Sequence, residues 1–249
     1  DAATLRALAD EPESPKDERA SKRALEIVRA ARASKSALGS TRAWNSALRA
    51  VARAANEDDG KARVREVWGY MRDGKVRLND FTLGELARGL CRASRDVPET
   101  LTTLREAVSL GATMNSYALT TMFAACKREQ YAYRRAKGKW ARDENKKMIE
   151  TLQEVWNAGR GYHNGYSLAN AMRTFQLSDR EDLALEIFKE GEVKVLDAHA
   201  LRCALQSYAA VEGLKSADKM YRRGKKEGVV IDVGHVNTLL YAAMESGDH

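Results

Sequence analysis

A short apolar pattern recurs along almost the whole chain and restricts the possible fold more than any other feature. Each copy has apolar residues at offsets of three, four and seven from its first residue, which places them on one stripe of an α-helix. Each stripe must be buried against another element. The six copies begin at Trp44, Leu83, Leu119, Leu168, Leu201 and Val236, which are 39, 36, 49, 33 and 35 residues apart. A period near 35 residues is typical of repeat arrays, so we predict an all-α solenoid of helix-turn-helix units.

The repeats also define the expected organisation of the chain. Residues 1–40 are expected to be an irregular N-terminal segment with an eroded repeat, because Pro12 and Pro15 interrupt its helices. The solenoid is expected to cover residues 41–249. Its repeats are 41–79, 80–115, 116–164, 165–197 and 198–232, followed by a partial repeat at 233–249. The partial repeat has only a first helix. Since solenoid ends need a polar cap, we expect either that the natural protein continues or that a partner covers this helix.

The third repeat contains an insertion of about 14 residues relative to a 35-residue period. The extra segment is expected at 127–147, between the two helices of the repeat, and it is rich in Lys and Arg with aromatic residues interleaved. Cationic side chains neutralise phosphates, and aromatic rings stack on unpaired bases. The candidate RNA contacts in the insertion are Arg134, Arg135, Lys137, Lys139 and Trp140. The alternative is a lengthened helix pair with a solvated, charged face.

The overall charge favours an anionic partner. The formal net charge of the 249 residues is +7, and nucleic acid is the commonest partner of basic proteins. No apolar run is long enough to span a bilayer, so we expect no membrane insertion. The chain begins at Asp1, which either a removed targeting peptide or a trimmed sequence would explain.

Sequence motifs give no indication of catalysis. The four His residues are dispersed, and the chain has no H-E-x-x-H, no G-x-S-x-G and no Gly-Lys-Ser/Thr loop. Cys91, Cys126 and Cys203 are too far apart for the usual zinc motifs and are expected to be small apolar core residues. We therefore expect no enzyme activity, no cofactor and no metal. Any catalytic domain would lie beyond His249.

Several stretches share a consensus in addition to the period. Trp44–Leu48 and Val236–Leu240 match one start of a first helix, Ala184–Phe188 matches a second helix, and residues 111–115 and 228–232 match a Gly-x-x-x-Asp/Asn ending. Together these residues resemble the pentatricopeptide repeat family from Thr41 to His249. The tetratricopeptide repeat fits less well, since its Leu-Gly pair is missing at the required offset. HEAT and armadillo repeats are longer and less evenly spaced.

This resemblance implies a right-handed α-solenoid in which each repeat faces one nucleotide of single-stranded RNA. In the family, two side chains choose the base: one directly follows the leading apolar anchor of the first helix, and the other is the last residue of the repeat. The corresponding pairs are Asn45 with Asn79, Gly84 with Asn115, Thr120 with Asn164, Ala169 with Asp197, and Arg202 with Asp232, and Asn237 would open a sixth. By the family's usual correspondence, the pair Thr120/Asn164 favours adenine and the pair Asn45/Asn79 a pyrimidine.

Three of the five pairs depart from the family's pattern. Gly84 and Ala169 have no hydrogen-bonding side chain, and Arg202 is long and charged. The alternative is that these positions line the inner face of the solenoid, and that Asn at a repeat end is a turn residue.

Two functions from different classes follow from these features. The first is an organellar RNA-binding pentatricopeptide repeat protein that acts in RNA processing, stability or translation. The resemblance implies a mitochondrion or, alternatively, a chloroplast. The second is a structural component of a large organellar ribonucleoprotein, such as a mitochondrial ribosome, that contacts ribosomal RNA and other proteins of the particle. A protein-only assembly scaffold is the third possibility.

Overall fold

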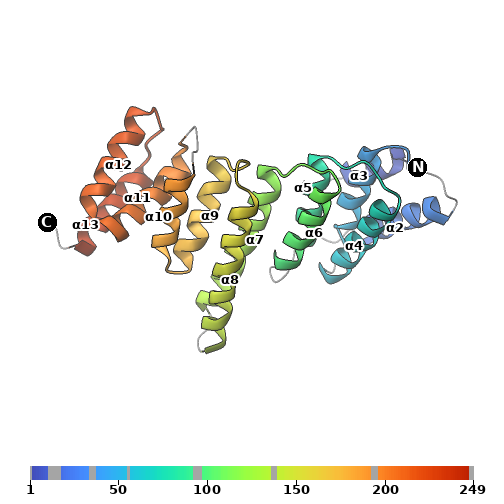
Figure 1. Cartoon of the computed structure of the whole chain (residues 1–249), viewed down its shortest axis with the longest axis horizontal. Helices are drawn as coiled ribbons and strands as arrows, with labels where there is room; N and C mark the ends of the chain where they lie inside the picture. Colours follow the sequence, from blue (N-terminus) through green and yellow to red (C-terminus); the bar gives the residue numbers. More distant parts are fainter. Residues whose placement is uncertain are drawn as a thin grey trace. The chain divides into compact units, whose positions relative to one another are not determined.

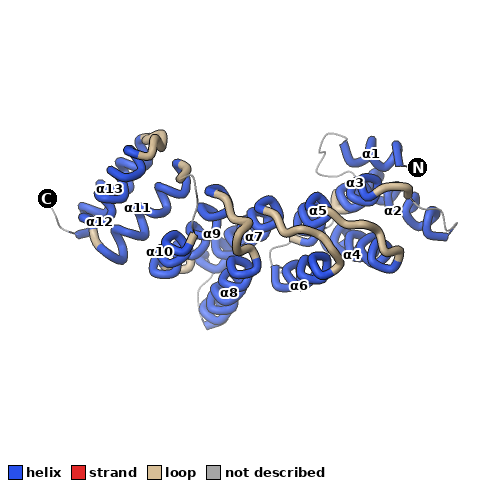
Figure 2. The backbone as a smooth tube through the Cα atoms, turned by 45° about the horizontal axis from the view of Figure 1, so that its top comes forward, coloured by secondary structure: helices blue, strands red, loops and turns tan. Residues whose placement is uncertain are grey.

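The chain folds into α-helices joined by turns. The computed structural model describes residues 2–10, 18–33, 38–54, 57–91, 97–135, 139–191 and 196–246. These residues form thirteen helices and no strand (Figures 1 and 2). The predicted all-α fold of helix-turn-helix units is therefore confirmed, and its right-handed sense stays a prediction. No helix in the described part of the chain is both long and apolar enough to cross a membrane.

The residues Asp1–Ala125 form one compact unit. Its helices are α1 (Ala2–Asp10), α2 (Glu18–Ala33), α3 (Thr41–Val51), α4 (Glu57–Asp73), α5 (Asp80–Leu90), α6 (Val97–Ser109) and the first half of α7 (Ser116–Arg135). The first helix α3 contacts the second helices α2 and α4 and the next first helix α5, while α5 contacts α4 and α6. The second helices α2 and α4 also touch each other. Neighbouring repeats of this unit therefore stack through both of their helices. The N-terminal α1 packs on α3 and α2.

The residues Cys126–His249 form a second compact unit. Its helices after α7 are α8 (Lys139–Ala158), α9 (Gly165–Leu177), α10 (Glu181–Glu190), α11 (Ala198–Glu212), α12 (Leu214–Lys226) and α13 (Val233–Ser246). The first helix α9 contacts α8, α10 and α11, and α11 contacts α10, α12 and α13. The first helices of this unit therefore contact each other and the adjacent second helices, as α3 and α5 do in the first unit.

The insertion lengthens a helix pair instead of forming a separate segment. α7 and α8 are each 20 residues long, and α8 extends past its neighbours α9 and α10 at one end (Figure 1). Residues 136–138, which separate the two helices, lie outside the described residues.

The recurring apolar stripe forms the core in five of its six copies. Side chains such as Leu83, Phe123 and Phe175 are completely buried. Full burial of one such side chain contributes about 1.5–3 kcal/mol relative to an exposed one. The sixth copy differs, because Val236 and Leu240 on α13 are 41% and 56% exposed.

The glycines of the two Gly-x-x-x-Asp/Asn endings lie just after helices and are left-handed. Gly111 and Gly228 have φ angles of +102° and +82°. Glycine is favoured in this left-handed region because it has no Cβ. After α4, by contrast, the left-handed residue is Lys75, with a φ angle of +50°.

Glycine also allows two helices of the first unit to approach closely. An ideal Cβ at Gly89 of α5 would lie 2.7 Å from Cγ2 of Val64 on α4, and Val64 is completely buried. The valine side chain is stiff and cannot easily move away. By contrast, a Cβ at Gly69, inside α4, would meet nothing within 4 Å.

The two glycines therefore respond in opposite directions to alanine. Gly69→Ala is expected to stabilise the protein by about 0.5–1 kcal/mol, because alanine favours a helix interior. Gly89→Ala is expected to destabilise it by about 1 kcal/mol, since overpacking of about 1–3 kcal/mol exceeds the same helix gain. Thermal unfolding followed by circular dichroism measures both variants. A higher melting temperature for Gly89→Ala would contradict this account of the α4–α5 contact.

Candidate nucleic-acid interface

The first helices α3, α5, α7, α9, α11 and α13 all begin with the same polar interaction. The side-chain oxygen of the preceding residue accepts a hydrogen bond from the backbone N–H three residues later, at 2.7–3.3 Å. This is an N-cap, which satisfies one of the unpaired N–H groups at a helix start. The six capping residues are Ser40, Asn79, Asn115, Asn164, Asp197 and Asp232. The last five are the repeat-end residues of the predicted base-reading pairs, so each of them has a structural role.

Asn45 and Asn79 come together between neighbouring repeats. The Asn45 Nδ2 amide donates to Asn79 Oδ1 at 3.1 Å, and the Thr82 hydroxyl donates to Asn45 Oδ1 at 3.0 Å. Asn79 Oδ1 also accepts the capping bond from the Thr82 N–H. The amide Nδ2 of Asn79 has no acceptor among the described residues.

Gly84 and Asn115 belong to a different arrangement. The Asn115 amide donates to the Asp80 carbonyl oxygen at 2.6 Å, one turn before Gly84 on α5. An ideal Cβ at Gly84 would lie only 2.8 Å from Cδ1 of Tyr117. The missing side chain at Gly84 therefore makes room for the Tyr117 ring.

Thr120 belongs to the first compact unit and Asn164 to the second. Thr120 is half-buried on α7, and Asn164 is exposed at the start of α9. Asn164 forms a reciprocal cap, because its backbone N–H donates to the Ser167 hydroxyl at 2.9 Å. Its amide Nδ2 has no acceptor within the described part of the chain.

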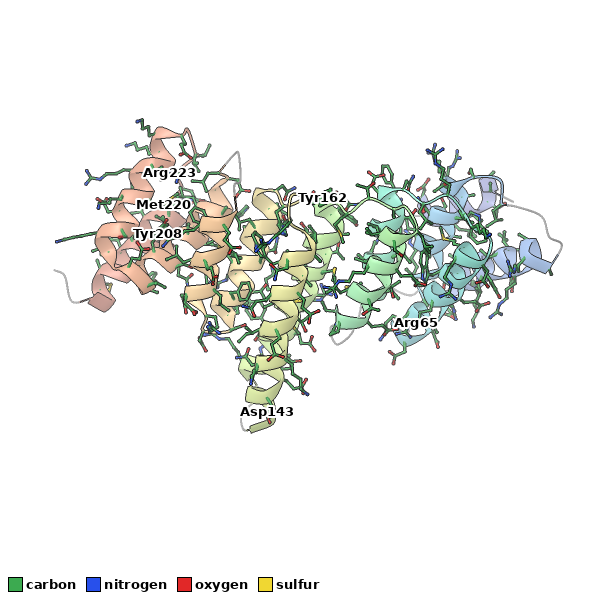
Figure 3. The ribbon with its side chains drawn as sticks, in the orientation of Figure 1. Arg65, Asp143, Tyr162, Tyr208, Met220 and Arg223 are labelled. Carbon is green, nitrogen blue, oxygen red and sulfur yellow. The ribbon has the colours of Figure 1, made fainter. Side chains whose placement is uncertain are left out.

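A stacked ring pair fixes the turn that leads to Asn164. The rings of His163 and Trp156 lie 3.8 Å apart at an angle of 9°, and His163 Nε2 lies 2.9 Å from the Trp156 carbonyl oxygen. Burial lowers the pKa of His163 below its usual value, which keeps the ring neutral near pH 7. Tyr162 is in the same turn, at the opposite end of α8 from Asp143 (Figure 3).

Ala169 offers no polar group at its position on α9. Its side chain is buried, and its carbonyl oxygen accepts a weak hydrogen bond from Cys203 Sγ at 3.7 Å. Burial raises the pKa of Cys203 to about 11, so this thiol stays protonated. The paired Asp197 lies against Gly165, where an added Cβ would collide with its carboxylate.

Arg202 and Asp232 neutralise each other. Arg202 Nη2 lies 2.9 Å and 2.7 Å from the two carboxylate oxygens of Asp232. Partial burial acts to raise the pKa of Asp232, but hydrogen bonds from His235 and the charge of Arg202 lower it overall. The guanidinium occupies the space that a Cβ at Gly234 would need. Asn237, which would open the sixth pair, is exposed on α13.

The candidate contacts in the insertion are only partly described. Arg134 Nη2 binds Asp179 Oδ1 at 2.6 Å, which ties α7 to the turn between α9 and α10. Arg135 is exposed at the end of α7. Lys137 lies outside the described residues, as do the side chains of Lys139 and Trp140. Arg134 thus has a structural partner, and the RNA contacts of this set stay predictions.

Three exposed aromatic residues at equivalent positions of their repeats were not singled out from the sequence. Phe81, Tyr117 and Tyr166 each occupy the second position of a first helix, and they are 66%, 55% and 56% exposed. Each precedes a predicted base-reading residue by three positions, so the two lie on the same helix face. The signal was present in the sequence, because an aromatic residue stands at this position in three consecutive repeats. We call these three residues, two in the first compact unit and one in the second, the aromatic row, after their shared position in successive repeats.

The groups described above can take part in recognition of a ligand. The aromatic row offers flat apolar faces, and the neighbouring Asn amides offer hydrogen bonds. No group of three or more His, Cys, Asp or Glu residues in the described ranges is close enough to hold a metal ion.

No protein-family model matches the chain, and no curated protein matches it. Among solved structures, the chain is similar to the pentatricopeptide repeat domain of protein-only RNase P 1 from Arabidopsis thaliana, whose structure was determined in complex with tRNA. The TM-score is 0.48 at 13% sequence identity, and the match covers 76% of this chain and 93% of that chain. A likeness of this degree concerns the path of the backbone and not the side chains of the interface.

Two substitutions at Asn164 separate capping from base reading. Asn164→Ala is expected to lower the free energy of unfolding by about 1 kcal/mol, because the cap of α9 is lost. Asn164→Ser keeps a capping oxygen and so nearly keeps the stability, but it removes the amide. If the amide binds a base, Asn164→Ser weakens RNA binding by about 2- to 10-fold, the value of one hydrogen bond. Melting curves and selection from randomised RNA provide the two readouts. An unchanged base preference in Asn164→Ser would assign Asn164 to capping alone.

Proposed function

We propose that the chain binds single-stranded RNA along its first helices and acts as an organellar pentatricopeptide repeat protein in RNA processing, stability or translation. The aromatic row is the observation that carries this proposal. Side chains of Phe and Tyr usually bury most of their surface, and these three, which expose more than half of it at equivalent helix positions, each suit the stacking of a base. Stacking of an unpaired base on an aromatic ring contributes about 1–3 kcal/mol per base.

The hydrogen-bonding groups beside the aromatic row suit a limited choice of bases. The free amides of Asn79 and Asn164 and the exposed Asn237 can each reach a base edge. Gly84 and Ala169 add no hydrogen bond. We therefore expect binding energy to come mainly from stacking and phosphate contacts. The adenine preference of Thr120/Asn164 and the pyrimidine preference of Asn45/Asn79 are part of the proposal, as the family's usual correspondence supports them.

The proposed location is a mitochondrion, with a chloroplast as the alternative. The family resemblance of the repeats supports an organelle, and the net charge of +7 supports an anionic partner.

A second candidate function is a structural role in a large organellar ribonucleoprotein, such as a mitochondrial ribosome. The ion pair between Arg202 and Asp232 favours it, because two predicted base-reading side chains satisfy each other. The exposed apolar residues Leu240, Tyr241 and Met244 of α13 also suit contact with proteins of a particle. A protein-only scaffold would share this apolar surface but would not need the aromatic row.

The aromatic row can be tested by removing the rings while keeping their bulk. Phe81→Leu, Tyr117→Leu and Tyr166→Leu are each expected to weaken binding to single-stranded RNA by about 5- to 150-fold, which corresponds to one lost stacking interaction. Leucine retains apolar contact, including the packing of residue 117 on Gly84. Fluorescence anisotropy with a labelled oligonucleotide measures the dissociation constants.

The matched control is Tyr162→Leu. This tyrosine is 45% exposed but lies in a turn and not on a first helix (Figure 3). Its replacement is expected to leave RNA affinity unchanged, and Tyr166→Trp is expected to preserve or increase it. Equal affinity of the wild type and all three leucine variants would refute the proposed role of the aromatic row.

Sedimentation of the endogenous protein, with and without ribonuclease, distinguishes the two candidate functions. A transcript-binding protein is expected to migrate in light fractions that shift after ribonuclease treatment. Stoichiometric migration with a ribosomal subunit would instead establish the structural role and would make the base-reading pairs surface residues only.

A further inference from the structure

The outward face of α12 carries a cationic stripe that is separate from the aromatic row. Lys215, Lys219, Arg222 and Lys226 follow one another at intervals of four, three and four residues, so they lie along one side of the helix. All four side chains are exposed. We call these four residues the α12 stripe. It extends over about 16 Å, from the helical rise of 1.5 Å per residue.

The opposite side of α12 holds the helix in the fold. Ala217 and Met220 are buried, and Gly224 packs so closely on Leu201 of α11 that a Cβ would lie 2.6 Å from Leu201 Cδ2. The α12 stripe therefore contributes nothing to this packing.

The stripe also lacks the ion pairs that the second helices of the first unit use to bind each other. There, Arg29 on α2 binds Glu66 on α4 at 2.7 Å, and Arg72 on α4 binds Glu106 on α6 at 3.1 Å. Arg65 binds Glu99 between the same two helices. These arginines connect neighbouring repeats, and their charges are neutralised.

The acidic groups around α12 leave most of the stripe unpaired. Arg222 binds Asp218 at 2.9 Å, and Arg223 binds Glu227 at 2.6 Å, both within or next to the helix. Glu212 binds Lys189 of α10, and this bond and the nearby charge of Lys219 both lower the pKa of the Glu212 carboxyl group. No carboxylate among the described residues forms an ion pair with the ammonium groups of the stripe's three lysines.

We propose that the α12 stripe binds the phosphate backbone of RNA outside the stretch whose bases meet the first helices. This inference rests on the proposed function. A line of cations spaced by one helical turn matches a linear polyanion, and lysine binds phosphate as a flexible point charge. Contacts between the stripe and phosphates do not involve the base edges, so they add affinity without sequence preference. An anionic membrane fits less well, because a membrane-surface helix inserts its apolar side, which α12 buries in the core.

The experiment compares two RNA lengths and two triple variants. The short probe has about six unpaired nucleotides, one for each first helix that carries the apolar pattern, and the long probe adds a flank on either side. The stripe variant is Lys215→Gln, Lys219→Gln and Lys226→Gln, which removes three unpaired charges and keeps good helix formers. The control variant is Arg19→Gln, Lys22→Gln and Arg23→Gln, on the exposed face of α2, with the same loss of charge.

The stripe variant is expected to bind the short probe as the wild type does. For the long probe, the negative slope of log K against log salt is expected to become less steep by about 2, which amounts to about 100-fold weaker binding at 0.1 M salt if binding at 1 M is unchanged. The control variant is expected to keep the wild-type slope.

The possible failures are distinguishable. If the wild type binds neither probe, both the proposed function and this inference are overturned. If the wild type binds both probes and the stripe variant keeps its slope, only the α12 stripe is refuted. If both triple variants lose the same affinity for the long probe, the loss comes from net charge and not from the position of the charges. That result would also refute the role of the α12 stripe. Binding of the stripe to anionic lipid vesicles, with no change in RNA affinity, would assign it to a membrane instead.

Discussion

The N-cap at the end of each repeat is the interaction on which the rest of the first-helix surface depends. One short polar side chain ends a repeat and fixes the start of the next first helix, and replacing it with alanine costs about 0.5–2 kcal/mol. The cap also decides what remains for a ligand. In Asn79 and Asn164 the oxygen faces the helix, so only the amide nitrogen is available to a base. The structural role and the proposed recognition role of these residues are therefore compatible, because they use different atoms.

A predicted base-reading residue and the second residue of the next first helix compete for the same space. At Gly84 the base-reading side chain is absent, and the ring of Tyr117 from the next repeat fills its place. At Arg202 the opposite is found, because the guanidinium occupies the space over Gly234, where α5, α7, α9 and α11 have an aromatic residue or a histidine. In these two cases, a small residue at one of the two positions leaves room for a large one at the other. Two of the three departures from the family's pattern, Gly84 and Arg202, therefore take part in packing between repeats.

Sequence periodicity predicted the helices and the core, because burial of one stripe is a local property of each helix. The repeat-end Asn and Asp residues were also predictable as turn residues, since capping depends on the next three residues alone. The bond between Asn45 and Asn79 was not predictable, because it depends on how closely two repeats stack. The aromatic row was predictable from its repeated position but was missed, since Phe81 and its equivalents lie outside the apolar period and resemble ordinary surface residues.

The net charge, like the apolar period, is a property of the sequence that does not show which residues meet in the fold. A total of +7 indicates an anionic partner but does not locate the cations that meet it. On α4, the exposed Arg65 and Arg72 are bound to glutamates of the next second helix, so they stabilise the stack and offer little to a polyanion. On α12, equally exposed lysines have no such partners. Exposed ion pairs are individually weak, about 0–1 kcal/mol each, but they determine where positive potential remains. The cations free to bind phosphate are therefore those that the packing between repeats does not use, and only the three-dimensional structure separates the two sets.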